Sequence, residues 1–163
     1  MNRNTLFCLL LTLTLLFMGC TQNKPVQESA VTFYYLSETI AFGTADGVIA
    51  EEQRPDENMD ISAALELYLQ GPLSTGLQSP FPVGLFLADV QFEGEHLCVT
   101  LSDDIIKLTD MELTLACSCL AKTCFGLGEY KEVRIFADGT TINGANYLSF
   151  RSDSVLLSDE SGY

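Results

Sequence analysis

Apolar and polar positions along the chain predict strands and helices in turn, after an apolar N-terminal run. Residues 31–36 are rich in aromatic and β-branched side chains, as strands usually are. Residues 48–54 form a plausible second strand, which should stop at Pro55. Over residues 61–70 the apolar side chains recur at the spacing of one helix face, and Asp60 can cap the start of that helix.

The end of this helix and the next two strands also have clear signals. Gly71 suits the left-handed position after a helix, and the proline that follows it blocks continuation. Apolar and polar residues then alternate over residues 88–93 and again over residues 96–101. This alternation predicts a hairpin whose turn contains Gly94.

A second helix and a last strand complete the pattern. Thr109 and Glu112 have the spacing of a capping box, which predicts a helix from there to about Phe125, with Gly126 as its stop. Residues 132–137 are the last clear strand. The order β-β-α-β-β-α-β predicts a single α+β domain, in which a small mixed sheet carries two helices on one face.

The same pattern divides the chain into four parts. Residues 1–19 are predicted to be a signal peptide, and residues 20–30 a polar, flexible tether. Residues 31–139 form the folded domain, and residues 140–163 hold a possible extra strand and an acidic C-terminal tail. An apolar content of 47% is ample for the core of one such domain.

The N-terminal segment has the features of a bacterial lipoprotein signal. Arg3 precedes an apolar run over residues 6–18, which is nearer in length to the apolar region of a signal than to a spanning helix of about 20 residues. Gly19 and Cys20 at its end resemble the lipobox, whose thiol receives a diacylglycerol before cleavage makes it the N-terminus. This resemblance implies lipid attachment at Cys20 and a place on the outer face of the cell membrane. The alternatives are an ordinary cleaved signal or an uncleaved anchor.

The charge balance limits the choice of partners. The chain has 22 acidic and 8 basic side chains, which gives a net charge of −14. Such a chain repels phosphate backbones and anionic lipid heads, so nucleic acid is excluded as a partner. The charge favours cationic partners, divalent ions or simple solubility.

Four cysteines follow Cys20, namely Cys98, Cys117, Cys119 and Cys124. Along a helix Cys117 and Cys124 are about 10 Å apart, too far for a disulfide, and Cys117 and Cys119 point in different directions. Cys117 and Cys124 have the spacing of a core stripe and are interpreted as small, inert core residues. A disulfide from Cys98 to the helix and a metal or redox function of the thiols remain open.

Few residues offer catalytic or ligand-binding chemistry. His96 is the one histidine, and it lies at the hairpin turn with no nucleophile motif beside it. Residues 56–60 begin like a calcium loop but lack its glycine and its final glutamate. Residues 102–104 are interpreted as a solvated turn rather than a cation site. The sequence therefore predicts no enzymatic activity, no metal site and no cofactor.

Several segments together resemble the GerMN (Germane) domain. In order they are residues 64–72, the loop 79–84, residues 94–102, and residues 133–139 after a helix. The similarity covers roughly residues 31–139, nearly all of the predicted folded part. The family occurs in lipoproteins of spore-forming Firmicutes implicated in sporulation and germination, and in other envelope lipoproteins. The resemblance implies a non-catalytic α/β module.

The resemblance also implies a function. It implies a lipoprotein held to the membrane through Cys20 that acts in cell-envelope, sporulation or germination assembly. Its partners would be envelope or sporulation proteins or the cell wall. The sporulation protein that names the family has two tandem copies of the domain, whereas this chain has room for one. The alternative function is that of a cysteine-dependent metal-binding or redox protein of the envelope.

Overall fold

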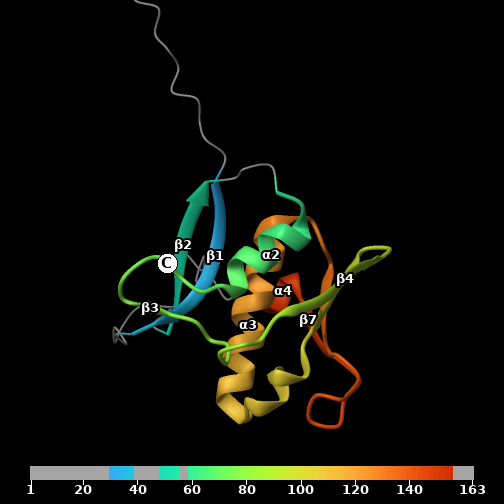
Figure 1. The fold of residues 1–163 in the computed structure, drawn as a ribbon. Coiled ribbons are helices and arrows are strands. Elements are labelled where there is room, and N and C mark those ends of the chain that lie inside the picture. Colours follow the sequence, from blue (N-terminus) through green and yellow to red (C-terminus); the bar gives the residue numbers. More distant parts are fainter. Residues whose placement is uncertain (1–29, 39–47, 56–58, 156–163) are drawn as a thin grey trace, which may run out of the picture.

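The computed structural model describes residues 30–38, 48–55 and 59–155 (Figure 1). The predicted signal peptide, Cys20, almost all of the tether and residues 156–163 of the predicted tail lie outside the described residues. The elements, in chain order, are β1 (Ala30–Ser37), β2 (Ile49–Pro55), α2 (Ile61–Leu69), β3 (Leu77–Gln78), β4 (Leu87–Glu93), β5 (His96–Leu101), the 3-10 helix η1 (Asp103–Lys107), α3 (Asp110–Leu127), β6 (Glu132–Ala137), β7 (Leu148–Arg151) and α4 (Ser152–Val155).

The described strands form two sheets rather than one. β1 pairs antiparallel with β2 and with the short β3, giving the order β2-β1-β3. The other sheet has the order β4-β5-β6-β7, and its β5 and β6 are parallel while the outer pairs are antiparallel. The α+β class and the mixed sheet are confirmed, but the first two strands belong to a separate sheet.

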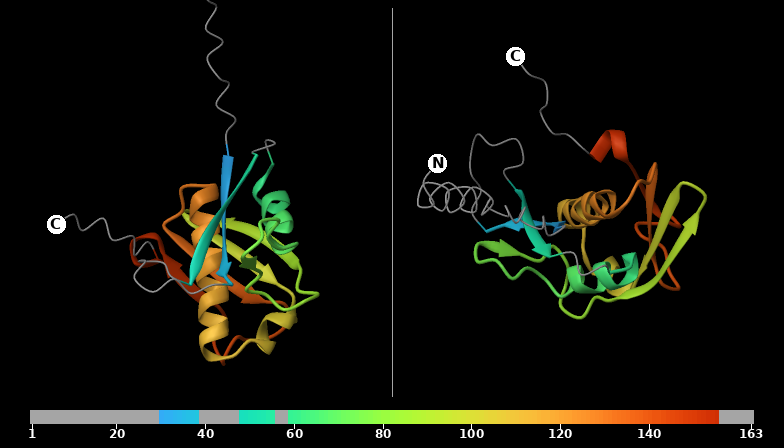
Figure 2. Two further views of the ribbon diagram at one scale, coloured as in Figure 1. Left: turned by 90° about the vertical axis from the view of Figure 1, so that its left-hand side faces the viewer. Right: turned by 90° about the horizontal axis from the view of Figure 1, so that it is seen from above.

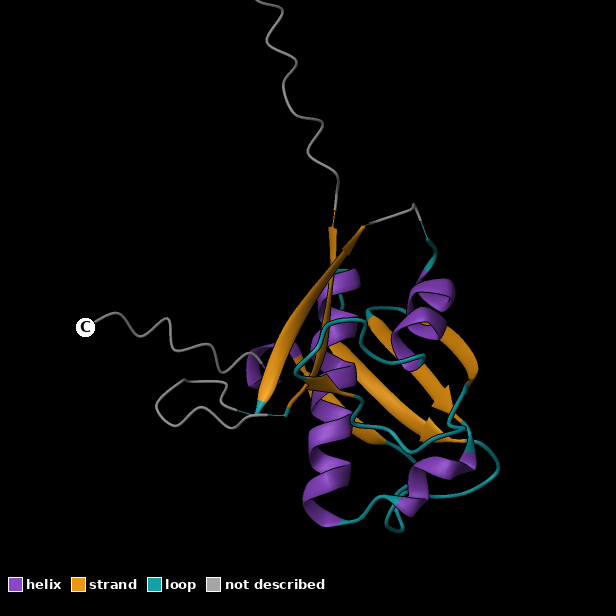
Figure 3. Cartoon of the chain, turned by 60° about the vertical axis from the view of Figure 1, so that its left-hand side comes forward, coloured by secondary structure: helices purple, strands orange, loops and turns teal. Residues whose placement is uncertain are grey.

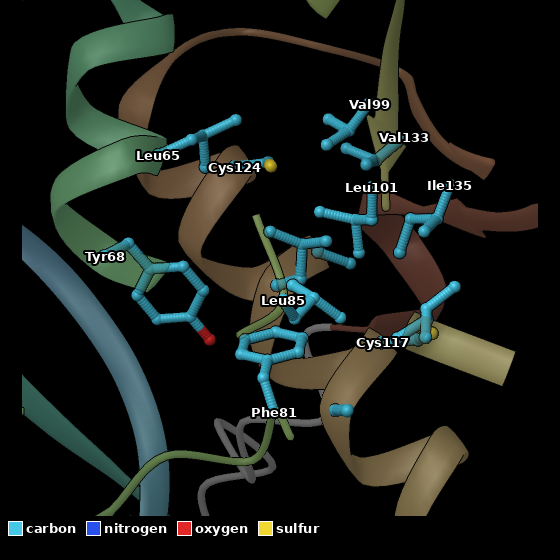
Figure 4. Close-up of a cluster of buried hydrophobic side chains, with 14 of the residues drawn as sticks. Leu65, Tyr68, Phe81, Leu85, Val99, Leu101, Cys117, Cys124, Val133 and Ile135 are labelled. Atoms are coloured by element: carbon cyan, nitrogen blue, oxygen red, sulfur yellow. The ribbon is translucent and has the colours of Figure 1, made fainter. Parts of the chain in front are cut away.

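The two long helices lie between the sheets (Figure 2). As predicted, α2 and α3 share one face of the four-stranded sheet, and β1 packs on them from the other side. Phe33 and Tyr35 of β1 are fully buried in the same cluster as Tyr68 of α2. The rings of Tyr35 and Tyr68 stack with their centroids 5.0 Å apart. Figure 4 shows Tyr68 in the part of this core that also holds apolar side chains of the second sheet.

Helix α3 explains why β1 does not join the four-stranded sheet. The Tyr34 backbone N–H donates a hydrogen bond to Thr123 Oγ1 at 3.0 Å, so a helix side chain occupies the place of a neighbouring strand. α3 comes close to β1 at Gly126, where a Cβ atom would lie 3.6 Å from the Thr32 carbonyl oxygen, an ordinary contact distance. β3 pairs with β1 only at its last two residues, Leu36 and Ser37. Most of this edge of β1 is therefore covered by a helix.

The predicted limits of α2 are confirmed. Asp60 is its N-cap, and Asp60 Oδ1 accepts a hydrogen bond from the Ala63 backbone N–H at 2.8 Å. Gly71 follows the C-cap residue with φ +95°, a conformation that glycine adopts without steric cost. The hairpin turn also has the expected glycine conformation, since Gly94 has φ +64°.

The predicted limits of α3 are corrected at both ends. Thr109 is the N-cap, but its side chain makes no capping hydrogen bond, so the capping box does not form. A capping box needs a backbone that passes directly from an extended N-cap residue into helical residues. Asp110, the residue after the N-cap, instead has φ +48°. At the other end α3 continues past Gly126, and Gly128 is the C-cap. A Cβ atom at Gly128 would lie 2.5 Å from Tyr130 Oη, so the side chain of Tyr130 occupies that space.

The connection from β5 to β6 runs through two helices. η1 leads into the start of α3 at one end of the molecule (Figure 3), and β6 then returns alongside β5. β6 has the predicted bounds, and β7 lies in the region where a possible extra strand was predicted. Within the described residues, no helix combines the length and the apolar character that crossing a bilayer requires.

Candidate functional site

Cys20, the predicted site of lipid attachment, lies outside the described residues. The anchor therefore stays a prediction from the sequence, and the candidate sites below all belong to the folded domain.

The four described cysteines are buried and unpaired. The core interpretation of Cys117 and Cys124 is confirmed, because both are fully buried beside apolar side chains (Figure 4). Cys119 is equally buried although it lies off the predicted stripe, since α3 has β1 on one side and the second sheet on the other. Cys98 is buried without a disulfide to any described cysteine.

The surroundings of these thiols oppose metal or redox chemistry. Burial raises the pKa of the Cys117 and Cys119 thiols to about 12 and raises the pKa of Cys124 further. Reactive and metal-bound cysteines are thiolates, which these surroundings disfavour. Among the described residues, no group of three or more His, Cys, Asp or Glu side chains could hold a metal ion. The geometry therefore gives the cysteine-dependent alternative no support.

His96 lies beside a carboxylate rather than alone at a turn. It is the first residue of β5, and its Nδ1 atom is 2.9 Å from Glu132 Oε2 on the neighbouring β6, without forming a hydrogen bond. Glu132 accepts hydrogen bonds from Ser149 and Arg134, which hold its pKa below the ordinary value. In the described part of the chain His96 has no hydrogen bond to a serine or cysteine, so the pair lacks an assembled nucleophile.

This histidine lines an open, polar pocket of about 350 Å³. Its other lining residues are Lys131, Glu132, Arg151, Ser152 and Asp153. Lys131 pairs with Glu95, and Arg151 pairs with Asp153. The charges of this pocket are thus largely balanced within the domain.

Residues 102–104 hold a loop in place. Ser102 is buried, its backbone N–H donates to the Phe86 carbonyl oxygen at 2.9 Å, and its Oγ accepts from the Phe86 N–H at 3.3 Å. Asp104 pairs with Lys107. The segment was predicted to be a solvated turn. In the structure Ser102 is instead buried, and its hydrogen bonds hold the backbone of Phe86 in place.

The sequence did not predict the buried ion pair between Arg54 and Glu52. Arg54 Nε lies 2.5 Å from Glu52 Oε1, and both side chains are almost fully buried. Arg54 also donates to the Gly71 carbonyl oxygen at 2.6 Å. Glu52 Oε2 accepts from the backbone N–H groups of Leu73 and Ser74 at 2.9 and 2.7 Å. The pair ties β2 to the end of α2 and to the loop that follows.

These contacts control the ionisation of Glu52. Desolvation by itself raises the pKa of a buried carboxyl group. Here the hydrogen bonds from Ser74 and from Arg54, with the charge of Arg54, outweigh desolvation and hold the pKa of Glu52 below 4.5. Glu52 and Arg54 have opposite charges and lie two residues apart, on the same face of a strand. This spacing is the feature of the sequence that could have predicted the pair.

A second hollow lies between α2 and the start of β4. We call it the α2–β4 groove; it has a volume of about 370 Å³ and is lined by Glu66, Leu69, Gln70, Leu85, Phe86 and Leu87. Among them Leu85 is buried, whereas the side chain of Phe86 is 58% exposed. Val83, in the same loop, is fully exposed. In contrast to the polar pocket at His96, this groove offers an apolar contact surface.

Residues 32–143 match the Germane family, whose description is "Sporulation and spore germination". The chain belongs to the Germane family. The match runs from β1 to beyond β6 and includes both long helices of the Germane domain described above, whereas β7 lies after its end. A search of curated proteins found no match.

Two solved structures have the same fold as this Germane domain. The tandem GerMN domains of the sporulation protein GerM from Bacillus subtilis share 20% identity with it at a TM-score of 0.52, over 74% of this chain and 44% of that chain. The first GerMN domain of the same protein shares 12% identity at a TM-score of 0.54, over 72% of this chain and 91% of that chain. This chain thus spans less than half the length of the tandem structure.

Proposed function

We propose that this Germane-family chain is a lipid-anchored, extracytoplasmic interaction module that acts in cell-envelope assembly during sporulation or germination. The family match over residues 32–143 carries the proposal. The lipobox-like sequence at Cys20 supplies the anchor, and envelope or sporulation proteins or the cell wall are its partners.

The described surface supports action by contact rather than by catalysis. The His96–Glu132 pair has no nucleophile bonded to it, and burial raises the pKa of each described cysteine thiol. Phe86 and the leucines that line the α2–β4 groove form an apolar hollow, and contiguous apolar surface is typical of sites of protein contact.

A membrane tether suits such a module. Holding the domain at the membrane raises its effective concentration near envelope partners, so a contact of modest affinity suffices. Releasing the domain should therefore weaken its function even though every contact residue is still present.

The anchor is tested by comparing two cysteines of the N-terminal segment in the full chain. We expect Cys20→Ser to abolish the lipid mass on the N-terminal peptide and to leave an unprocessed precursor, because acyl transfer needs the thiol. Cys8→Ser is the matched control and should be lipidated and processed like the wild type. Mass spectrometry of the N-terminal peptides reads both results, and a wild-type mature N-terminus without lipid contradicts the anchor.

The contact function is tested by complementing a deletion strain. The mature chain exported behind a cleaved signal without Cys20, and so released from the membrane, should complement poorly on the envelope or spore phenotype of the deletion, whereas the full-length Cys8→Ser and His96→Gln variants should complement fully. A folded His96→Gln protein that behaves like the deletion, while the released chain complements, would show that a chemical site carries the function.

A further inference from the structure

The α2–β4 groove has a fixed shape in the described structure. The end of α2 is held by Gly71 and by the guanidinium of Arg54, which binds the Gly71 carbonyl oxygen. On the opposite wall, Ser102 binds both the N–H and the carbonyl oxygen of Phe86. An exposed aromatic ring on a fixed backbone loses little conformational entropy when a partner packs against it.

The charged side chains that the groove-forming part of the chain contributes are all acidic. No lysine, arginine or histidine occurs between Arg54 and His96, the part of the chain that supplies every residue of the groove. Glu66 lines the groove, and Asp89 lies on the adjoining strand β4. A cationic ligand is therefore attracted to this side of the domain, and an anionic one is repelled.

The surface cations of the second sheet are gathered elsewhere. Arg134 and Arg151 lie on the face of the four-stranded sheet that turns away from α2, in register with Glu132 and its neighbours. Both are already engaged, Arg134 with Glu93 and Glu132, and Arg151 with Asp153. They do not offset the acidic character of the groove.

We propose that the α2–β4 groove binds a basic segment of a partner protein, which inserts one apolar side chain between Leu69 and Phe86 while its cations face Glu66. The inference rests on the proposed function and adds to it the chemistry of the partner. A second copy of this chain fits poorly, because the domain has a net negative surface of its own. An anionic membrane surface is disfavoured by the same repulsion.

Binding is tested with a labelled peptide in which a single leucine is flanked by lysines. The full chain is reconstituted in zwitterionic phosphatidylcholine vesicles, and the fluorescence anisotropy of the peptide is measured against empty vesicles. We expect saturable binding that weakens with added salt. A peptide with alanine in place of leucine should bind more weakly, and a peptide with glutamates in place of lysines should not bind. Equal affinity for the leucine and alanine peptides overturns the proposal.

The site is tested with matched substitutions. Phe86 and Phe92 are both 58% exposed, but only Phe86 lines the groove, so Phe92→Ala controls for Phe86→Ala. We expect Phe86→Ala to weaken peptide binding by roughly tenfold and Phe92→Ala to leave it unchanged. Glu66→Gln should also weaken binding, whereas Glu112→Gln, on exposed α3 surface, should not. Equal effects within either pair overturn the proposal.

Location and competing occupants are tested in the same preparation. A photoreactive leucine in the peptide should cross-link to residues of the groove, and cross-links confined to the His96 pocket would contradict the proposal. Concentration-dependent self-association abolished by Phe86→Ala would assign the groove to a second copy. Binding to anionic vesicles abolished by Phe86→Ala would assign it to a membrane surface, which also overturns the proposal.

Complementation separates this inference from the proposed function. If Phe86→Ala complements fully while the released chain does not, the groove is not the docking site but the tethered interaction module stands. If the released chain complements fully while Phe86→Ala fails, the groove is supported and the tethered function is wrong.

Discussion

At the scale of single residues, Arg54 and Glu52 show how charge can be placed in the interior. The guanidinium of Arg54 lies at the C-terminal end of α2, where the helix dipole presents partial negative charge. Glu52 in turn receives two backbone N–H groups from the loop after the helix. Removing either partner leaves the other as a buried, uncompensated ion, which is far more costly than losing a surface ion pair.

This arrangement predicts a pH-dependent contribution to stability. We expect Glu52→Gln to lower the free energy of unfolding by roughly 2–3 kcal/mol at neutral pH, because Arg54 loses its counter-ion. The pKa of Glu52 is lowered in the folded protein, so its stabilisation is present above the ordinary value of 4.5 and is lost as pH falls through the folded pKa. The gap between wild type and variant should therefore narrow in acid, as measured by urea unfolding at a series of pH values.

The exposed Glu112→Gln variant is the control for this measurement. It should unfold close to the wild type at neutral pH, since its side chain is solvated. A Glu52→Gln deficit that is as large in acid as at neutral pH would show that lost packing, rather than lost charge, causes the destabilisation.

Sequence reasoning succeeded at residues whose roles are local and failed at this pair. The roles of Asp60 and Gly71 depend only on the adjacent helix, so their types and spacing were sufficient. In β2, by contrast, charged or polar side chains occupy both faces from Glu51 to Arg54. Alternation therefore could not show which face points inward, and the groups that satisfy Arg54 come from a distant helix end.

At the scale of elements, α3 shows how tertiary packing overrides a local stop signal. Gly126 is among the commonest kinds of residue after a helix, yet it remains helical because it lies at the close approach of α3 to β1. The predicted stripe that contains Cys117 and Cys124 also accounts for only one buried side of α3, whereas the structure buries a second side as well. A helix between two sheets buries residues around most of its circumference, which an amphipathic pattern does not reveal.

Two glycines near the end of α3 should respond oppositely to alanine. We expect Gly126→Ala to raise the free energy of unfolding by roughly 0.5–1 kcal/mol, since alanine favours the helix and the new Cβ atom meets Thr32 at ordinary contact distance. Gly128→Ala should instead destabilise the domain, because its Cβ atom would clash with Tyr130. Urea unfolding compares both with the wild type.

The test depends on whether each substitution raises or lowers the free energy of unfolding. Destabilisation by Gly126→Ala would show that α3 approaches β1 more tightly than the contact with Thr32 implies. A stabilising Gly128→Ala would show that Tyr130 moves away at little cost.

The assignment of strands to sheets marks the limit of prediction at this scale. The β4–β5 hairpin joins neighbours in the chain, so its alternation and its turn were enough to predict the pair. The separation of β1 and β2 from the other sheet depends on α3, which follows them by many residues and donates Thr123 to the edge of β1. The pattern of apolar and polar residues within β1 does not indicate that a helix side chain binds its edge.

At the scale of the whole molecule, surplus negative charge dominates the electrostatics. The chain has a net charge of −14, and its described surface cations Lys107, Lys131, Arg134 and Arg151 are all in ion pairs. We expect the melting temperature to rise when the salt concentration increases from about 20 mM to about 150 mM, because screening reduces self-repulsion. Calorimetry measures this directly. A melting temperature that falls would show that the attractive pairs outweigh the repulsion.

The first strand of the domain also has a mechanical consequence. The chain enters the described fold at Ala30, and β1 is held along its length by seven residue pairs with β2. A pull from the N-terminal side that runs along this strand loads those hydrogen bonds together, in shear, rather than breaking them one after another. Thr123 and the body of α3 hold the other edge of the same strand. A domain attached to a membrane through this end would thus bear tension on one of its most firmly held elements.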